Sequence, residues 1–339
     1  MRILIISDAW EPQVNGVVRT LQSVARELEQ MGRQVGFITP DQYRSVPCPT
    51  YPEIRLAMTR AKTVGERIAC FAPDAIHLST EGPLCLAARR WCLDRGVPFT
   101  TAYHTQFPDY VAKRTGLPAA AIWPYIRWFH APASAVLAST PQIREELAAQ
   151  GITQLAHWGR GVDLGLFRPD GPRHPGMQDL AGPIQLYVGR VAVEKNIEAF
   201  LALNTSGTKV IVGEGPALAD LKRRYPTVRF LGKLVGEELA AAYRSADVFV
   251  FPSLTDTFGL VMIEALASGV PIAAFPVTGP IDIVTPKSGA LNPDLAMAIK
   301  QALLCDADAC IAHAQGFSWR RSAEQFMSAL APVPSLSLA

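Results

Sequence analysis

The chain has 339 residues, of which 49% are hydrophobic and 18% charged, and its 32 Lys and Arg against 30 Asp and Glu leave a formal charge of +2. At about 150 residues per domain this length predicts two domains, and the apolar content excludes a disordered chain. The near balance of charge argues against a dedicated nucleic-acid-binding protein, which carries a net basic field that attracts phosphates.

The first half contains short apolar runs, each followed by a polar turn and a longer helical pattern: ILII, VGFIT, AIHL, FTTAY and AVLAS. Such runs predict parallel strands covered by helices on both faces. A helix is expected over 17–31, because apolar residues recur on one face from Val18 to Leu28 and Gly32 ends the pattern. Residues 1–165 are therefore expected to form one doubly wound α/β domain.

The second half repeats this scheme with IQLYVG, TKVIVG, VRFLG, DVFVFPS and PIAAF. A connector rich in Pro and Gly lies near 165–182, so a second Rossmann-like domain is expected over 166–316. The tail over 317–332 carries a helical stripe that includes Trp319 and Phe326 and needs a surface to cover. Two doubly wound domains are expected to face a central cleft, because ligands bind at the carboxyl ends of such strands.

The segment over 252–275, PSLTDTFGLVMIEALASGVPIAAF, is the richest in candidate chemistry. A helix is expected to begin near Phe258, so the amides of Gly259 and Leu260 would form an anion site at its N-terminus. Glu264 lies deeper among apolar residues and needs a polar partner. Asp256 precedes the helix on the same side, where a carboxylate suits sugar hydroxyls. The alternative is that Asp256 or Thr255 only caps the helix and that Glu264 pairs with a core Arg.

The segment GRVAVEKN follows the strand IQLYV and places Gly189, Arg190 and Lys195 at the carboxyl edge of the second sheet. Two cations close to a helix N-terminus can neutralise a diphosphate and stabilise the negative charge of a leaving group. The alternative is a pair of surface cations balanced by Glu194.

Two residues of the first domain follow strands in the same way. Gly16 forms a tight loop with Asn15 after the strand ILII, directly before the helix expected over 17–31. This loop lacks the GxGxxG fingerprint of dehydrogenases, although the Gly16 amide can still contact a phosphate. His104 follows the strand FTTAY and presents an imidazole at the cleft edge. The alternative for His104 is a structural histidine that binds a backbone group.

The stretch over 110–130 interleaves aromatic and basic residues, among them Tyr110, Trp123, Arg127 and Trp128. This composition suits an acceptor or membrane-interface site, and a core-packing helix pair is the equally weighted alternative. The apolar opening is too short for a signal peptide, and the apolar run over 117–126 is too short to cross a bilayer. The expected location is the cytoplasm, with peripheral contact to the cytoplasmic face of the inner membrane.

In order and content these segments resemble retaining glycosyltransferases of the GT-B fold, specifically glycosyltransferase family 4. The resemblance spans nearly the whole chain through DAWEPQVNGVVRT, YHTQFPDY, RGVDLGLFRP, YVGRVAVEKN, VGEGP, VRFLG, SADVFVFPS, DTFGLVMIEALASGVP and FSWRRSAEQF. It is similar to the branch with GDP-mannose-dependent α-mannosyltransferases, sulfoquinovosyl transferases and diacylglycerol glycosyltransferases.

The resemblance implies a role for each candidate residue. Arg190 and Lys195 would bind the donor diphosphate together with the amides of the 258–260 turn, and Glu264 would bind the ribose. Asp256 would contact sugar hydroxyls, Gly16 would lie against the phosphate or sugar, and His104 would orient the sugar. Asp256 replaces the first Glu of the family's E-x7-E motif and shortens its reach by one methylene. The tail helix would cross back to the first domain.

The activity so implied is metal-independent transfer of a hexose or hexuronic acid, with retention, from a GDP- or UDP-linked sugar to a lipid or glycolipid hydroxyl such as that of diacylglycerol. No cofactor beyond the nucleotide sugar and no nucleic-acid partner are expected. The alternatives are a GDP-mannose-dependent α-mannosyltransferase acting on a glycan, a nucleotide-sugar epimerase or phosphorylase, and a nucleotide-sugar-binding regulator without catalysis.

Overall fold

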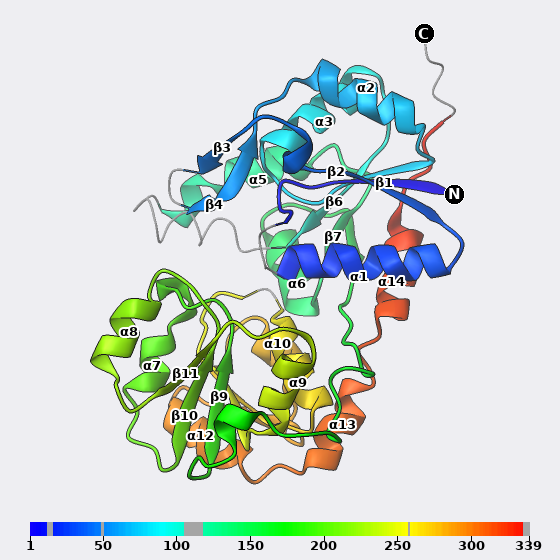
Figure 1. The fold of residues 1–339 in the computed structure, drawn as a ribbon. Coiled ribbons are helices and arrows are strands. Elements are labelled where there is room, and N and C mark those ends of the chain that lie inside the picture. The colour runs from blue at the N-terminus through cyan, green and yellow to red at the C-terminus, as the bar shows by residue number, and fades with distance from the viewer. Residues whose placement is uncertain (12–15, 49–50, 105–117, 257, 335–339) are drawn as a thin grey trace. The chain divides into compact units, whose positions relative to one another are not determined.

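The structure is a computed structural model that describes residues 1–11, 16–48, 51–104, 118–256 and 258–334 (Figure 1). The chain divides into two compact units. Unit 1 comprises Met1–Arg160 together with Trp319–Ala339, and unit 2 comprises Gly161–Ser318. The division after Arg160 falls slightly before the boundary expected at residue 165.

Unit 1 is built on a six-stranded parallel sheet with the strand order β2-β1-β5-β6-β7-β8. Its strands are β1 (Arg2–Ile6), β2 (Gln34–Ile38), β5 (Ala75–Leu78), β6 (Thr100–Tyr103), β7 (Val136–Ala138) and β8 (Leu155–His157). An antiparallel pair, β3 (Ser45–Cys48) and β4 (Tyr51–Ala57), lies between β2 and β5 in the chain. The helices are α1 (Gly16–Gln30), α2 (Ala61–Phe71), α3 (Pro83–Asp94), α5 (Trp123–His130), α6 (Pro141–Ala149) and α14 (Trp319–Ala329), with short 3-10 turns η1 (Pro40–Gln42) and η2 (Ala119–Ala121).

Both faces of this sheet are covered, as β1 shows. Ile3 and Ile5 pack in one core with α1 and α14, whereas Leu4 and Ile6 pack in the other core with α2, α3 and α5. Because side chains alternate along a strand, both faces of β1 must be apolar. The doubly wound prediction is confirmed, and α14 packs beside α1, as the resemblance implied (Figure 1).

Unit 2 repeats the layout with a parallel sheet of order β11-β10-β9-β12-β13-β14. Its strands are β9 (Ile184–Val188), β10 (Thr208–Val212), β11 (Arg229–Gly232), β12 (Val248–Phe251), β13 (Ile272–Ala274) and β14 (Gly289–Leu291). The helices are α7 (Ile197–Leu201), α8 (Leu218–Arg224), α9 (Gly236–Arg244), α10 (Leu260–Ala267), α11 (Pro280–Ile283), α12 (Leu295–Ala302) and α13 (Ala307–Ala314), with η3 (Pro175–Met177) and η4 (Val193–Lys195).

The strand order reverses direction once in each sheet, between β1 and β5 in unit 1 and between β9 and β12 in unit 2. At such a switch point the loops that leave two neighbouring strands run to opposite faces and open a crevice at the carboxyl edge, where doubly wound proteins bind ligands. The loops after β9 and β12 are those that carry Lys195 and Asp256.

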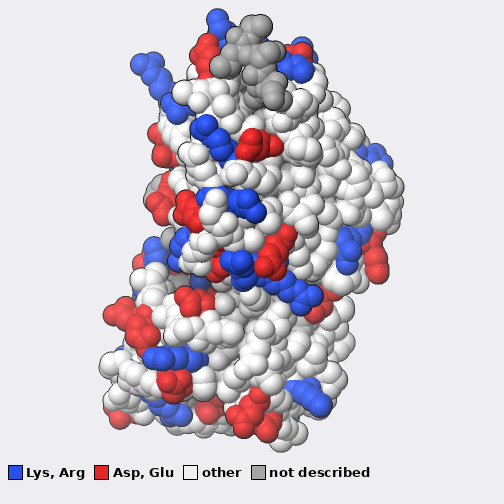
Figure 2. Space-filling view, turned by 90° about the vertical axis from the view of Figure 1, so that its right-hand side faces the viewer, with Lys and Arg blue, Asp and Glu red and all other residues white. Residues whose placement is uncertain are grey.

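Charge differs between the units. Unit 1 has 19 Lys and Arg against 14 Asp and Glu, a formal charge of +5, whereas unit 2 has 13 against 16, a formal charge of −3. Figure 2 shows Lys and Arg interspersed with Asp and Glu over the face that it presents. Among the residues described, no helix is both long and apolar enough to span a membrane.

Candidate active site

The β9/β12 switch point of unit 2 brings Lys195 and Asp256 together. Lys195 Nζ lies 2.6 Å from Asp256 Oδ1, and both side chains remain partly exposed, at 26% and 20%. An ion pair that solvent reaches can exchange one partner for a ligand without leaving a buried charge unpaired. The two loops therefore present a cation and a carboxylate at one position.

Two hydrogen bonds shape the loop that carries Lys195. The buried hydroxyl of Tyr187, on β9, donates to the carbonyl of Arg190 at 2.9 Å. Asn196 adopts the left-handed conformation, with φ of 52°, and its Nδ2 donates to the carbonyl of Pro252 at 3.0 Å. Asn tolerates this conformation better than most residues. Its side chain thereby ties the loop after β9 to the loop after β12.

Gly189, in the same loop, is a position at which a side chain would collide with Tyr187. Its φ is 154°, and a Cβ there would lie 2.8 Å from the hydroxyl oxygen of Tyr187. Burial raises the pKa of Tyr187 well above its ordinary value, and the charges of Asp256 and Glu194 raise it further. Tyr187 is therefore a neutral hydrogen-bond donor at any physiological pH.

The helix that follows Asp256 begins after a glycine, which has no side chain to cap it. Gly259 occupies the N-cap position in the left-handed conformation, with φ of 86°, and α10 begins at Leu260. The first N–H groups of a helix have no acceptor within the helix, so this end offers donors to an anion. The N-cap position of α10 is held by Gly259, whereas Asp256 pairs with Lys195 through its Oδ1.

Phe258 contributes to packing. Its side chain is 7% exposed, and its ring meets that of Phe317 edge to face, with centroids 6.0 Å apart. The Phe258 side chain is therefore part of the packing of unit 2.

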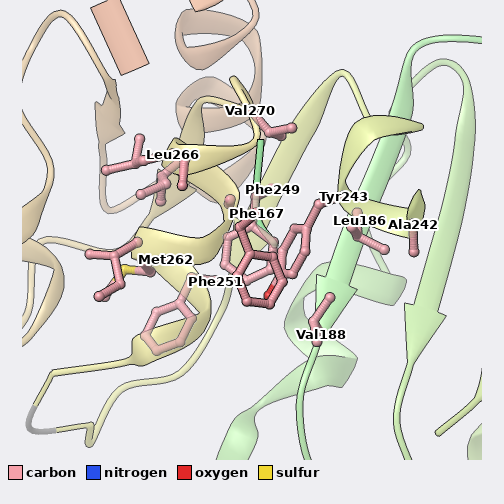
Figure 3. Packing of buried hydrophobic residues seen from close by; sticks show 14 of the residues in the cluster. Phe167, Leu186, Val188, Ala242, Tyr243, Phe249, Phe251, Met262, Leu266 and Val270 are labelled. Carbon is pink, nitrogen blue, oxygen red and sulfur yellow. The ribbon is translucent and has the colours of Figure 1, made fainter. Parts of the chain in front are cut away.

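Glu264 lies in the interior of unit 2, 3% exposed, and accepts a hydrogen bond from the hydroxyl of Tyr243 at 2.9 Å. The expectation of a polar partner is confirmed. Figure 3 shows Tyr243 in the aromatic cluster with Phe167 and Phe249, whose ring centroids lie 5.7 and 5.8 Å from that of Tyr243. Sequence reasoning missed Tyr243, whose one signal is a phenol that follows the apolar run LAAA.

His104, in unit 1, directly follows β6. Its Nδ1 lies 3.2 Å from Nη2 of Arg160, and its ring meets the Trp158 ring edge to face at 5.2 Å. Burial lowers the pKa of His104 well below its ordinary value, and the charge of Arg160 lowers it further. His104 is thus a neutral imidazole bound by a guanidinium. Sequence reasoning did not identify Arg160.

Gly16 is exposed and is the first residue of α1, where its carbonyl accepts from the Thr20 hydroxyl at 2.7 Å. The preceding loop, 12–15, lies outside the described residues. The structure thus places Gly16 at a helix N-terminus after β1, at the switch point of unit 1.

The aromatic and basic stretch divides between the core and the surface. Trp123 of α5 is partly buried and stacks on Tyr103, whereas Trp128 is 52% exposed and Arg127 is exposed. The Arg89 guanidinium stacks on the Trp128 ring at 4.0 Å and donates to the Trp128 carbonyl at 2.6 Å. One side of α5 therefore packs on the core and the other presents Arg127 and Trp128. Tyr110 lies outside the described residues.

Within the ranges that the structure describes, no three His, Cys, Asp or Glu side chains are grouped to bind a metal ion. The Asp-x-Asp pattern at 306–308 lies at the start of α13, where Asp306 caps the helix by accepting from the Asp308 N–H at 2.8 Å. Metal-independent chemistry stays a prediction.

Comparison with known proteins gives consistent results in both halves of the chain. Residues 14–166 match the model of Glycosyltransferase Family 4, and residues 182–305 match that of Glycosyl transferases group 1. A GDP-mannose-dependent alpha-mannosyltransferase of Mycobacterium tuberculosis (strain CDC 1551 / Oshkosh) is 34% identical over 319 residues, 86% of this chain and 84% of that protein. An alpha-monoglucosyldiacylglycerol synthase of Streptococcus pneumoniae (strain ATCC BAA-255 / R6) is 28% identical over 91% of this chain and 79% of that protein.

Among solved structures, a sucrose-phosphate synthase from Thermosynechococcus elongatus superimposes with a TM-score of 0.76, covering 96% of this chain and 97% of that one at 23% identity. That likeness shows the fold of two Rossmann-like domains that the sequence predicted. Together with the sequence match to the mycobacterial enzyme, it identifies the chain as a GT-B glycosyltransferase that belongs to glycosyltransferase family 4.

Proposed function

We propose that this enzyme transfers a hexose or hexuronic acid from a GDP- or UDP-linked sugar to a hydroxyl of a lipid or glycolipid acceptor, with retention of configuration. The observation that carries the proposal is the Lys195–Asp256 pair at the β9/β12 switch point, beside the N-terminus of α10. A cation and the amides of a helix N-terminus suit a diphosphate, and a carboxylate suits the hydroxyls of the attached sugar.

The reaction requires stabilisation of a leaving diphosphate. The bond between the anomeric carbon and the diphosphate oxygen breaks, and its electron pair leaves with the diphosphate. The acceptor oxygen then bonds the anomeric carbon on the same face, and the acceptor proton passes to a diphosphate oxygen. Lys195, Arg190 and the amides of Gly259 and Leu260 stabilise the charge that develops on the leaving group.

Glu264 and Tyr243 supply the nucleoside end of the proposed site. Carboxylates bind the paired hydroxyls of a ribose in many nucleotide sites. A buried carboxylate is costly unless hydrogen-bonded, and the Tyr243 hydroxyl both lowers that cost and fixes the orientation of the group. Glu264 thus binds ribose in a set orientation.

The lipid acceptor is supported by unit 1. This unit carries a formal charge of +5, and α5 presents the exposed Trp128 beside the exposed Arg127. Basic and aromatic side chains together suit an anionic membrane interface. The pneumococcal relative is named for a diacylglycerol product. Peripheral contact with the cytoplasmic face of the membrane is part of the proposal.

The test begins with thermal shifts in GDP-mannose, UDP-glucose and UDP-glucuronic acid, because a ligand that binds only the folded state raises the melting temperature. The stabilising donor is then incubated with diacylglycerol vesicles, and the anomeric configuration of the product is read by NMR. We expect an α-linked glycolipid from the α-linked donor. An inverted product, or no transfer to any lipid, contradicts the proposal.

A second acceptor class is favoured by the mycobacterial relative, which is named a GDP-mannose-dependent alpha-mannosyltransferase. The same incubation with a soluble mannan in place of vesicles tests it. Mannosyl transfer to mannan without transfer to lipid would move the assignment to a glycan acceptor. Isomerisation of the donor in the absence of acceptor would instead indicate an epimerase.

A further inference from the structure

At the carboxyl edge of the first sheet, His104 lies in a network that reaches the C-terminal helix. We propose that Arg160 is a positioning residue that fixes His104 as its Nε2–H tautomer for contact with the donor sugar, and that α14 fixes Arg160 through Gly159. The contact with sugar rests on the proposed function, whereas the tautomer does not.

The tautomer follows from the chemistry of the two side chains. A guanidinium has N–H donors and no acceptor, so Nδ1 of His104, 3.2 Å from Arg160 Nη2, must accept. A neutral imidazole has one N–H, which is then on Nε2. His104 therefore carries its N–H on Nε2, and an N–H is the group that can donate to a hydroxyl oxygen of a sugar.

Arg160 is itself fixed on several sides. The residue is 7% exposed, and its Nη1 donates to the carbonyls of Trp158 at 2.6 Å and Gly159 at 3.2 Å. Its guanidinium carbon also lies 4.6 Å from the centroid of the Trp158 ring. A buried guanidinium is tolerated only where its donors are used, and these contacts leave it little freedom to turn.

Helix α14 completes the network from a distant part of the chain. The N–H of Gly159 donates to Oε1 of Gln325 at 2.8 Å, and the Gly159 carbonyl accepts from the Ser322 hydroxyl at 2.8 Å. Phe326, on the same helix, packs on the Trp158 ring with centroids 4.9 Å apart. The C-terminal helix thus binds the backbone at Gly159, directly before Arg160. By packing on unit 1, α14 helps to hold Arg160 in place beside His104.

The charges around His104 favour the neutral form. Arg160 repels a proton on the imidazole, and burial opposes it further. His77 lies fully buried on the neighbouring strand β5, where burial lowers its pKa to about 3. At neutral pH the charged group of this network is thus Arg160, whose pKa of about 9 remains above the solution value.

The tautomer is tested by long-range 1H–15N NMR of the full-length protein labelled at histidine, with the His104 signals assigned by their loss in His104→Gln. We expect the Nε2–H form at pH 7, persisting below the ordinary histidine pKa of about 6.5. In Arg160→Met, which removes the donors, we expect a mixture of tautomers and a higher His104 pKa, whereas Arg160→Lys keeps a donor and recovers most of the Nε2–H form. An Nδ1–H form in the wild type overturns the inference.

Kinetics test the consequence for transfer. Arg160→Met should lower kcat about 100-fold with little change in the KM for the donor, and its activity should fall at a higher pH than that of the wild type, because His104 now takes up a proton sooner. Arg160→Lys should restore part of kcat and the wild-type pH profile. A folded Arg160→Met with wild-type kcat and pH profile contradicts the role in transfer.

A separate variant covers the case in which Arg160→Met does not fold. Ser322→Ala with Gln325→Ala removes the two α14 contacts and keeps Arg160, and Glu324→Ala, on the exposed side of the same helix, is its control. The double variant should shift the His104 tautomer and kcat in the same direction as Arg160→Met does. A double variant with the wild-type tautomer and the wild-type kcat contradicts the inference. Absence of transfer by the wild type from every nucleotide sugar would refute the proposed function and leave the tautomer result standing.

Discussion

The two units present their candidate residues in opposite ways. In unit 2 the Lys195–Asp256 pair is partly exposed and comes from two loops at one switch point. In unit 1 His104 lies against the buried Arg160 and Trp158, and the network extends to the C-terminal helix. An exposed pair can exchange partners with a charged ligand, whereas a buried network sets the protonation and direction of one group. The proposed diphosphate site of unit 2 is thus suited to binding charge, and the network of unit 1 is suited to holding one imidazole in a set protonation state.

The largest effect is expected from Lys195→Ala. Loss of the ammonium removes charge stabilisation from the leaving diphosphate, so transfer should fall about 1000-fold while the melting temperature changes little. The measurement is the initial rate with saturating donor and acceptor. Lys300→Ala, at an exposed position on α12, is the matched control and should retain wild-type activity. If Lys195→Ala and Lys300→Ala transfer sugar at equal rates, Lys195 does not take part in the reaction.

Tyr243→Phe sharpens the comparison within unit 2. It removes the hydrogen bond to the buried Glu264 and should lower the free energy of unfolding by about 2 kcal/mol, as measured in urea. Donor affinity should also fall, because the carboxylate loses its orientation. Tyr225→Phe removes a hydroxyl that lies 3.3 Å from the exposed Glu198 and should have little effect on either quantity. If Tyr243→Phe and Tyr225→Phe bind the donor with the same affinity, Tyr243 does not contribute to the donor site.

Acid should destabilise unit 1 through His77. Its folded-state pKa of about 3 lies below the ordinary value of about 6.5, so the unfolded state binds more protons between these values. The contribution of neutral His77 is fully present above pH 6.5, and it should decline by about 1.4 kcal/mol per pH unit as pH falls toward 3.

The check is the free energy of unfolding measured by urea at several pH values. His77→Leu removes the titrating group and should show a shallower decline than the wild type. Identical slopes would show that His77 does not account for the acid sensitivity.

The smallest effect is expected from Trp128→Ala. The indole is about half exposed, so its transfer into an anionic vesicle surface is worth about 1 kcal/mol, roughly a fivefold change in partitioning. Sedimentation with phosphatidylglycerol vesicles measures this change. Leu304→Ala, which removes an 86% exposed apolar side chain from unit 2, is the control. A loss that is equal in both variants would argue against docking through α5.

Local patterns predicted the features that depend on neighbouring residues in the chain. Apolar runs and helical periodicity predicted both doubly wound sheets, and the predicted helix over 17–31 is observed as Gly16–Gln30. Lys195 and Asp256 were identified because each follows a strand within a short motif. Their direct pairing required the strand order, which places β9 beside β12.

Long-range partners escaped sequence reasoning for a physical reason. Arg160 lies 56 residues from His104, and Gln325 lies 166 residues from Gly159, so no local spacing relates them. In the sequence, Tyr243 resembles any core aromatic residue, and only the structure shows that its hydroxyl donates to Glu264. The need of a buried carboxylate for a partner was predictable, but the identity of that partner depends on how α9 packs on α10.

Titration calorimetry with GDP and UDP tests the central assignment, that the β9/β12 switch point of unit 2 binds the donor diphosphate. The account predicts that the wild type binds at least one of the two nucleotides, that Lys195→Ala weakens this binding about 100-fold, and that Lys300→Ala leaves it unchanged. Wild-type affinity in Lys195→Ala would contradict the account, because the diphosphate would then be bound elsewhere.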